Sequence, residues 1–186
     1  MSWQIFKANI KRRADRPESI DDIGQVAELW ANEYDAAIKR GRDATNFVTL
    51  QNGNKSGMQN LFKLGLQLGL SSNSPSFSLI NEFGKGVVTY WVGATLQPFP
   101  IPIIPAAGSI QNIVVLSNNV TIPGTWAPAP PVPPVLTTDV FIDIFILYAT
   151  IHLSTVQGMV STTSLYPAAP SPIPGPGIVP WFGYTV

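Results

Sequence analysis

Residues 77–105, FSLINEFGKGVVTYWVGATLQPFPIPIIP, contain the change of pattern on which the predicted fold depends. The two glycines of GKG (84–86) lie inside a helical pattern, where each costs about 1 kcal/mol against alanine, so we expect close packing there. After Leu96, prolines alternate with large apolar residues, which favours extended polyproline II. The stretch therefore ends a helical domain and begins an extended arm. The apolar residues that recur at helical spacing before this change are Phe77, Ile80, Phe83, Val87, Tyr90 and Ala94.

On the amino-terminal side, the same spacing predicts three further helices, at residues 3–14, 20–40 and 54–68. Ser19 followed by Asp22 is close to a capping box and predicts the start of the second of these helices. Gly41 and Gly69 predict the ends of the second and third. Between them, Phe47 to Leu50 is expected to form a short extended piece.

On the carboxyl-terminal side, SIQNIVVLSNNVTIPG (109–124) has the pattern of two short strands joined near Ser117 to Asn119, a hairpin. Thr137 or Thr138 is expected to cap a final helix, VFIDIFILYATIHLSTVQGMV (140–160). This helix is apolar on almost every side, which is typical of a helix at the centre of a bundle or wedged into an interface. A proline-rich stretch closes the chain.

These patterns predict a mainly α fold. It consists of a small helical domain of four or five helices, long proline-rich extended arms and at most one short β-hairpin. The predicted parts are a helical domain at 1–95, an arm with the hairpin at 96–136, an apolar helix packing on the helical domain at 137–165, and a carboxyl-terminal arm at 166–186.

Charge is distributed unevenly along the 186 residues. All eleven Lys and Arg residues precede residue 86, whereas sixteen of the eighteen prolines follow residue 97. From Gly86 onward the only charges are Asp139 and Asp143, so we expect other protein to cover much of the second half. The formal net charge of 0 excludes electrostatic binding of nucleic acid by the whole molecule.

Several classes of site and segment are excluded by composition. The chain has no cysteine and one histidine, which excludes disulfides, thiolate metal sites, a cysteine nucleophile and a histidine-rich metal site. The amino terminus lacks the apolar run of a signal peptide, so secretion is not expected. The run from Val140 to Leu153 is shorter than the ~20 residues that cross a bilayer, so no membrane association is expected.

The candidate chemical groups in the final helix favour a structural role. Asp139 and Asp143 are four residues apart and share a helix face, a spacing that suits a metal but also places negative charge favourably near the helix start. His152 is nine residues from Asp143 and therefore about half a turn away from it around the helix. With no G-x-S-x-G nucleophile elbow and no phosphate loop, we predict no enzyme activity, no cofactor and no metal.

Two sets of residues are candidates for contacts with other molecules. A basic cluster near the amino terminus could contact nucleic acid or an acidic partner: Lys7, Lys11, Arg12, Arg13 and Arg16. The large apolar residues of the proline-rich stretches are the candidate subunit interface: Phe99, Ile101, Ile103, Ile104, Trp126, Val132, Val135, Ile173, Ile178, Trp181, Phe182 and Tyr184. We expect replacement of Trp126 or Trp181 by alanine to impair assembly more than folding of residues 1–95.

Several phrases of the chain resemble small virion structural proteins of tailed bacteriophages, in particular myovirus-like phages of cyanobacteria and marine bacteria. The phrases are EYDAAIKRGRD (33–43), the GN of 53–54, YWVGATLQPFPIPIIPAAGSIQNI (90–113), IPGTW (122–126), IHLSTVQGMV (151–160) and YPAAPSPIPGPGIVPWFGYTV (166–186). The resemblance covers nearly the whole chain. It implies a non-enzymatic subunit of the neck (the head–tail connector region) or the tail, which forms a homo-oligomeric ring in the virion after assembly in the host cytoplasm. The implied partners are connector, portal, tail tube or sheath proteins.

Two other functions remain as alternatives. A capsid decoration or vertex protein would also be oligomeric, but we expect such a protein to be richer in β-structure and to have a more charged outer face. A proline-ligand adaptor would use the P-x-x-P spacing of PAPPVPP (128–134), although this segment has no neighbouring arginine.

Overall fold

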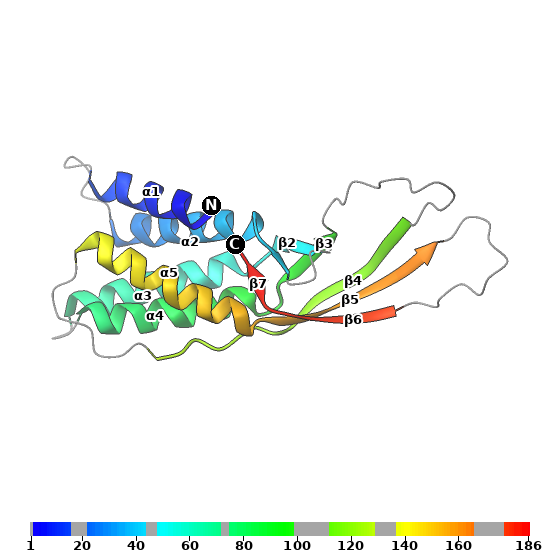
Figure 1. The fold of residues 1–186 in the computed structure, drawn as a ribbon. Helices are drawn as coiled ribbons and strands as arrows, with labels where there is room; N and C mark the ends of the chain where they lie inside the picture. The colour runs from blue at the N-terminus through cyan, green and yellow to red at the C-terminus, as the bar shows by residue number, and fades with distance from the viewer. Residues whose placement is uncertain are drawn as a thin grey trace.

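The computed structural model describes residues 2–15, 22–43, 48–71, 75–98, 112–128, 137–165 and 177–186. Within them the protein is mainly helical, as the sequence predicts, and its helices pack as a bundle from which an antiparallel sheet projects (Figure 1). The helices are α1 (Ser2–Ala14), α2 (Ile23–Lys39), α3 (Lys55–Ser71), α4 (Pro75–Trp91) and α5 (Thr138–Thr155). The strands are β1 (Arg42–Asp43), β2 (Val48–Asn52), β3 (Thr95–Pro98), β4 (Asn112–Ile122), β5 (Gln157–Leu165), β6 (Gly177–Phe182) and β7 (Tyr184–Thr185).

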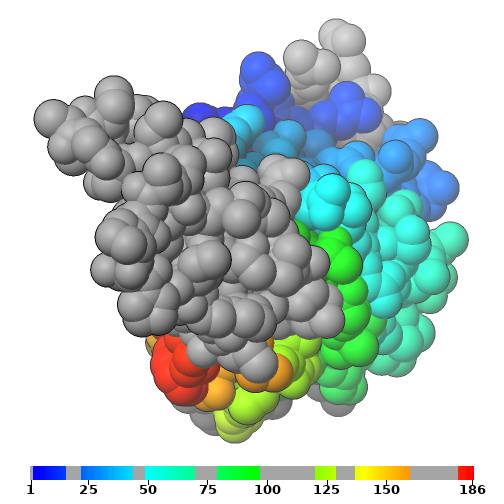
Figure 2. Space-filling model, turned by 90° about the vertical axis from the view of Figure 1, so that its right-hand side faces the viewer, coloured from blue at the N-terminus to red at the C-terminus, as the bar shows by residue number. Residues whose placement is uncertain are grey.

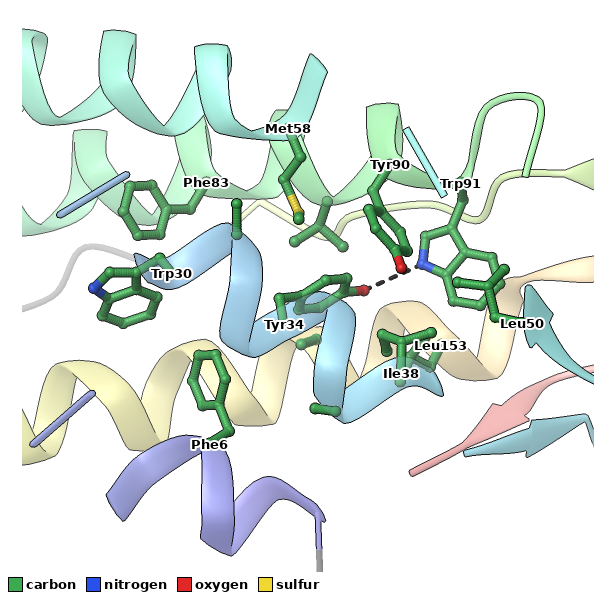
Figure 3. Close-up of a cluster of buried hydrophobic side chains, with 14 of the residues drawn as sticks. Phe6, Trp30, Tyr34, Ile38, Leu50, Met58, Phe83, Tyr90, Trp91 and Leu153 are labelled. Atoms are coloured by element: carbon green, nitrogen blue, oxygen red, sulfur yellow. Dashed lines mark hydrogen bonds between the residues drawn. The ribbon is translucent and has the colours of Figure 1, made fainter. Parts of the chain in front are cut away.

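The bundle is held together by aromatic side chains that the helical spacing places on inward faces. Trp30, Tyr34 and Ile38 of α2 follow one another at intervals of four residues and are all buried. Phe6 of α1 packs edge-on against Trp30, and Tyr34 accepts a hydrogen bond of 3.1 Å from the indole nitrogen of Trp91 (Figure 3). Most of the predicted apolar positions of the first four helices are therefore confirmed as core, although Ala14 and Leu68 are exposed.

The two glycines of α4 are close-packing positions, as predicted. Gly84 lies directly under the indole of Trp126. A Cβ atom at Gly86 would lie 2.7 Å from the ring of Phe62 on α3. Trp126 and Phe62 thus come nearer to α4 than a side chain at these two positions would permit.

The sheet has five strands in the order β2-β3-β4-β5-β6, and all neighbouring pairs are antiparallel. β4 and β5 pair along almost their whole length, and β6 lies on the other side of β5. Beyond β6, Gly183 has a φ of +83° and lets the chain turn so that β7 pairs with β1 beside the bundle. The two chain ends accordingly lie near each other on the bundle (Figure 1).

The predicted hairpin near Ser117 is wrong, because residues 112–122 form the single strand β4. The polar residues Ser117 to Asn119 do not turn the chain; they pair with residues 159–161 of β5. The register of the pairing between β4 and β5 shifts after Val115 and again after Val120. Each shift is a β-bulge, which accommodates the irregular order of apolar and polar residues along β4. The partner strand comes from a distant part of the sequence, so the local pattern alone could not identify it.

The predicted helix of residues 137–165 is too long, because α5 ends at Thr155 and β5 begins at Gln157. Ser154 and Thr155 donate their hydroxyl hydrogens to carbonyls of the last turn, and Val156 has the extended backbone angles φ −69° and ψ 137°. The start of α2 also differs, since Asp22 rather than Ser19 is the N-cap and accepts a hydrogen bond from the Gly24 amide.

The prediction that the proline-rich segments are extended arms is also corrected for those parts that the structure describes. Residues 112–122 and 177–182 belong to the subunit's own sheet, and β7 packs on its own bundle. The remaining parts of these segments, residues 99–111, 129–136 and 166–176, lie outside the described residues.

Candidate assembly interface

Both faces of the helix α5 are apolar, but one is buried in the bundle and the other is exposed. Its inner face packs into the bundle core through Ile142, Phe145, Ala149, His152 and Leu153. Its outer face carries large apolar side chains at intervals of seven and four residues: Val140 is 43%, Leu147 56% and Ile151 44% exposed. We call these three outward residues the α5 stripe.

A hollow of about 450 Å³ adjoins the α5 stripe. Its wall on α5 includes Thr150 and Ser154, and the opposite side is formed by Trp3 of α1 and the carboxyl-terminal residues 182–186. Phe182 lies at this hollow with 60% of its surface exposed. The hollow and the α5 stripe are separate apolar features of this side of the molecule, and the exposed Asp143, Thr150 and Ser154 lie among them on α5.

This surface suits contact with another apolar surface better than it suits catalysis. Burying apolar area releases about 25 cal/mol per Å², and contiguous apolar patches on a protein surface mark interaction sites. The hydroxyls of Thr150 and Ser154 on this surface already donate hydrogen bonds to backbone carbonyls of their own helix, those of Ile146 and Ile151 respectively. Among the described residues, no group of three or more His, Asp or Glu side chains is placed to hold a metal ion.

The exposed residues of α5 were not among the predicted interface residues. The sequence did carry their signal, because a helix that is apolar on almost every side has more apolar surface than one bundle can cover. By length and composition α5 is also the one described helix that could cross a membrane, but its inner face is buried among the other helices.

Two of the predicted interface residues, Trp181 and Tyr184, lie in the subunit's own core, with 1% and 3% of their surfaces exposed. Trp181 packs against the glycine backbone at Gly158 on the neighbouring strand β5. The Tyr184 hydroxyl donates to the Ile38 carbonyl and accepts from the Leu50 amide. The prediction that these two aromatics face another subunit is corrected, because a partner within the chain covers each of them.

Trp126 is also committed to its own subunit. Its indole lies on Gly84 of α4 and packs beside Phe145 and Tyr148 of α5. The amide of the preceding Thr125 donates to the Thr155 hydroxyl, which fixes the segment after β4 against α5. From these contacts we expect replacement of Trp126 to disturb folding, whereas the sequence alone predicted a loss mainly of assembly.

The other predicted interface residues divide into two groups. Phe182 is exposed at the hollow, in agreement with an interface role, and Ile178 lies within β6. Seven residues lie outside the described residues: Phe99, Ile101, Ile103, Ile104, Val132, Val135 and Ile173.

Most of the predicted basic cluster is occupied by partners in the same chain. The Nζ atoms of Lys7 and Lys11 on α1 form ion pairs with carboxylate oxygens of Asp143 and Asp139, respectively, on α5, each at 2.6 Å. The hydrogen bond from Lys11 holds the pKa of the Asp139 carboxyl below its ordinary value. These pairings explain why both acids share one helix face.

The other basic residues of the cluster have different surroundings. Arg12 donates to Asn9, and Arg13 also has an interaction partner. Arg16 lies outside the described residues. Arg12 keeps its charge beside the neutral Asn9, so contact of the cluster with nucleic acid or an acidic partner stays a prediction.

His152 is fully buried, and within the described residues neither of its ring nitrogens has a hydrogen-bond partner of good geometry. Gly124, in the left-handed region at φ +85°, brings backbone against the imidazole. Burial lowers the pKa of His152 to about 4, and the nearby Pro123 carbonyl offsets this only in part. The ring is neutral at pH 7 and faces the core, whereas Asp143 is exposed, so the two do not converge, as predicted.

Comparison of the chain with protein-family models, with curated proteins and with solved structures found no match.

Proposed function

We propose that this protein is a structural subunit of a tailed-bacteriophage virion, in the neck or tail, and that it assembles into a homo-oligomeric ring through protein–protein contacts. The observation that carries the assembly role is the α5 stripe, three large apolar side chains that the subunit itself leaves exposed. The location in a virion rests on the resemblance of the chain to phage structural proteins.

Two further features support an assembly role over a soluble enzyme or a nucleic-acid binder. The chain carries charge on only 12% of its residues, and the acids of α5 are already paired with α1. The α5 stripe can therefore be buried by another protein without stranding an unpaired charge, which would oppose association. The exposed Phe182 beside the hollow adds an aromatic anchor of the kind that is enriched at interface centres.

The proposal is tested by the mass of the purified full-length chain at increasing concentration, measured by size-exclusion chromatography with light scattering and imaged by negative-stain electron microscopy. We expect a closed multi-subunit species. A chain that stays monomeric at every concentration would contradict self-assembly into a ring.

A further inference from the structure

A second apolar stripe lies on α3. Leu64 and Leu68 are four residues apart, so they share one helix face, and each is 44% exposed. We call this pair the α3 stripe. These exposed fractions are similar to those of Val140 and Ile151 in the α5 stripe.

The two stripes point in opposite directions from the core. Phe62 of α3 and Phe145 of α5 face each other inside the bundle, with ring centroids 6.4 Å apart. At ~100° per residue, Leu64 and Leu68 lie about 200° and 240° around α3 from Phe62. The same steps separate Leu147 and Ile151 from Phe145, so both stripes face away from the shared core.

The packing of the helices agrees with this geometry. α3 packs against α2 and α4, whereas α5 packs against α1 and α4. Viewed from the end at which the sheet projects, the turquoise residues of α3 lie on one flank of the molecule and the red carboxyl-terminal residues on the other (Figure 2).

Charge on the two helices is complementary. The only charged residues of α3 are Lys55 and Lys63, and the only ones of α5 are Asp139 and Asp143. Lys63 is exposed next to Leu64. Asp143 is one helical turn before Leu147, and its side chain remains 56% exposed although it is bound to Lys7. An α3 surface against its own copy joins like charges, whereas against an α5 surface its Lys63 meets the Asp143 carboxylate, which Lys7 already binds but leaves 56% exposed.

We infer that the α5 stripe and hollow of one subunit receive the α3 stripe of a second copy of this chain, so that subunits associate head to tail. Two different patches on opposite sides of one subunit produce a heterologous contact, which generates a ring when the rotation closes. The inference rests on the proposed function, and it names the partner of the surface on α5.

The test uses complementation between two full-length variants, each with one damaged stripe. Leu64→Asp leaves the α5 stripe intact, and Leu147→Asp leaves the α3 stripe intact. Val92→Asp is the matched control, because Val92 is also 56% exposed and belongs to neither stripe. Circular dichroism establishes that all three variants are folded, and light scattering gives their masses alone and in mixtures.

We expect Leu64→Asp and Leu147→Asp each to lose association by at least tenfold in dissociation constant, while Val92→Asp assembles like the wild type. An equimolar mixture of the two stripe variants should form a species of two subunits and nothing larger, because each contributes one intact surface. Monomers in that mixture, or wild-type assembly by Leu64→Asp alone, would overturn the inference.

The inference and the proposed function fail in different ways. If the wild type assembles and both stripe variants assemble equally well, the head-to-tail contact is wrong but a self-assembling structural subunit stands. If the wild type itself is monomeric at all concentrations, both the contact and the homo-oligomeric ring are wrong.

Discussion

Tyr184 joins three parts of the fold through one buried hydroxyl. The oxygen lies 2.9 Å from the Ile38 carbonyl, 3.0 Å from the Leu50 amide and 3.2 Å from the Thr49 hydroxyl. The end of the chain is thereby fixed to the end of α2 and to β2. The carboxyl-terminal residues are part of the core for this reason.

Tyr184→Phe is expected to lower the free energy of unfolding by about 1–3 kcal/mol, because it leaves the buried Leu50 amide without its partner, whereas the Ile38 carbonyl keeps its bond from the Gly41 amide. Urea unfolding followed by circular dichroism measures the change. Tyr148→Phe is the matched control, since within the described residues the Tyr148 hydroxyl makes no hydrogen bond. Equal stability of both variants would contradict the role given to Tyr184.

His152 should make the protein less stable in acid. Its pKa in the folded state is about 4, below the 6.5 of the unfolded chain, so the unfolded state binds more protons between these values. Stability is therefore full above pH 6.5 and falls as the pH drops toward 4, by on the order of 3 kcal/mol.

The chain has a single histidine, so its proton NMR resonance can be followed without ambiguity. We expect that resonance to titrate near pH 4 and the loss of stability between pH 6.5 and 5 to disappear in His152→Gln. A titration midpoint near 6.5 would show that the ring is not buried as described.

At the level of single residues, the sequence identified which aromatics are important but not what they contact. Trp126 and Trp181 are packed because Gly84 and Gly158 leave room for their indoles. Each glycine is more than twenty residues from its tryptophan, and one sequence contains no signal that pairs them. An aromatic residue in a proline-rich stretch was therefore assigned to another subunit.

At the level of elements, α4 and the segment after β4 are locked together by the contact of Trp126 with Gly84. Gly84→Ala would favour the helix by about 1 kcal/mol in an exposed position, but here the new methyl group collides with the indole. We expect a net loss of about 1–3 kcal/mol, as for other overpacked cores.

Thermal unfolding of Gly84→Ala, beside Lys85→Ala on the exposed side of α4, measures the effect of that collision. Lys85 is exposed and pairs only with Glu82 of its own helix among the partners described, so its loss should change little. A Gly84→Ala protein as stable as the wild type would show that Trp126 does not rest on this position.

The contact between α1 and α5 includes ion pairs that titrate, beside the stacked rings of Phe6 and Phe145. Lys11 lowers the pKa of the Asp139 carboxyl, so the folded state holds this proton less tightly than the unfolded chain does. The pair therefore contributes stability above the ordinary carboxyl pKa and loses it in acid. Carbon-detected NMR of Lys11→Met should show Asp139 titrating at a higher pH than in the wild type; an unchanged midpoint would contradict the pairing.

The helices could be predicted from the sequence because their apolar spacing is local. The sheet could not, since β4 pairs with a strand about forty residues later and the polar Ser117 to Asn119 lies within it. The end of α5 was missed for a related reason: Val156, Met159 and Val160 continue the apolar residues beyond Thr155, and the pairing with β4 and β6 makes this run a strand.

At the scale of the whole molecule, residues 1–95 are not a separate unit. Phe145 and Leu153 of α5, and Trp181 and Tyr184 at the chain end, belong to the same core as the first four helices. The core therefore contains α5 and the last residues of the chain together with the first four helices. A truncation to residues 1–95 would expose this core, so the full chain is the proper object for assembly experiments.

In our proposal, the α5 stripe, which stays exposed after folding, is the assembly surface. The α5 stripe could be anticipated from the apolar composition of its helix, but which side of α5 faces outward depends on the packing of the other helices. The central claim is that another subunit covers this stripe in the assembled state.

Thiol alkylation tests that claim most directly, because the chain contains no cysteine and a single one can be introduced without background. The rate of maleimide reaction is measured for Leu147→Cys and, as a control, Val92→Cys, in assembled protein and in protein diluted to the monomer. The account predicts that assembly slows reaction at position 147 at least tenfold and leaves position 92 unchanged. Equal rates at position 147 in both states would contradict it.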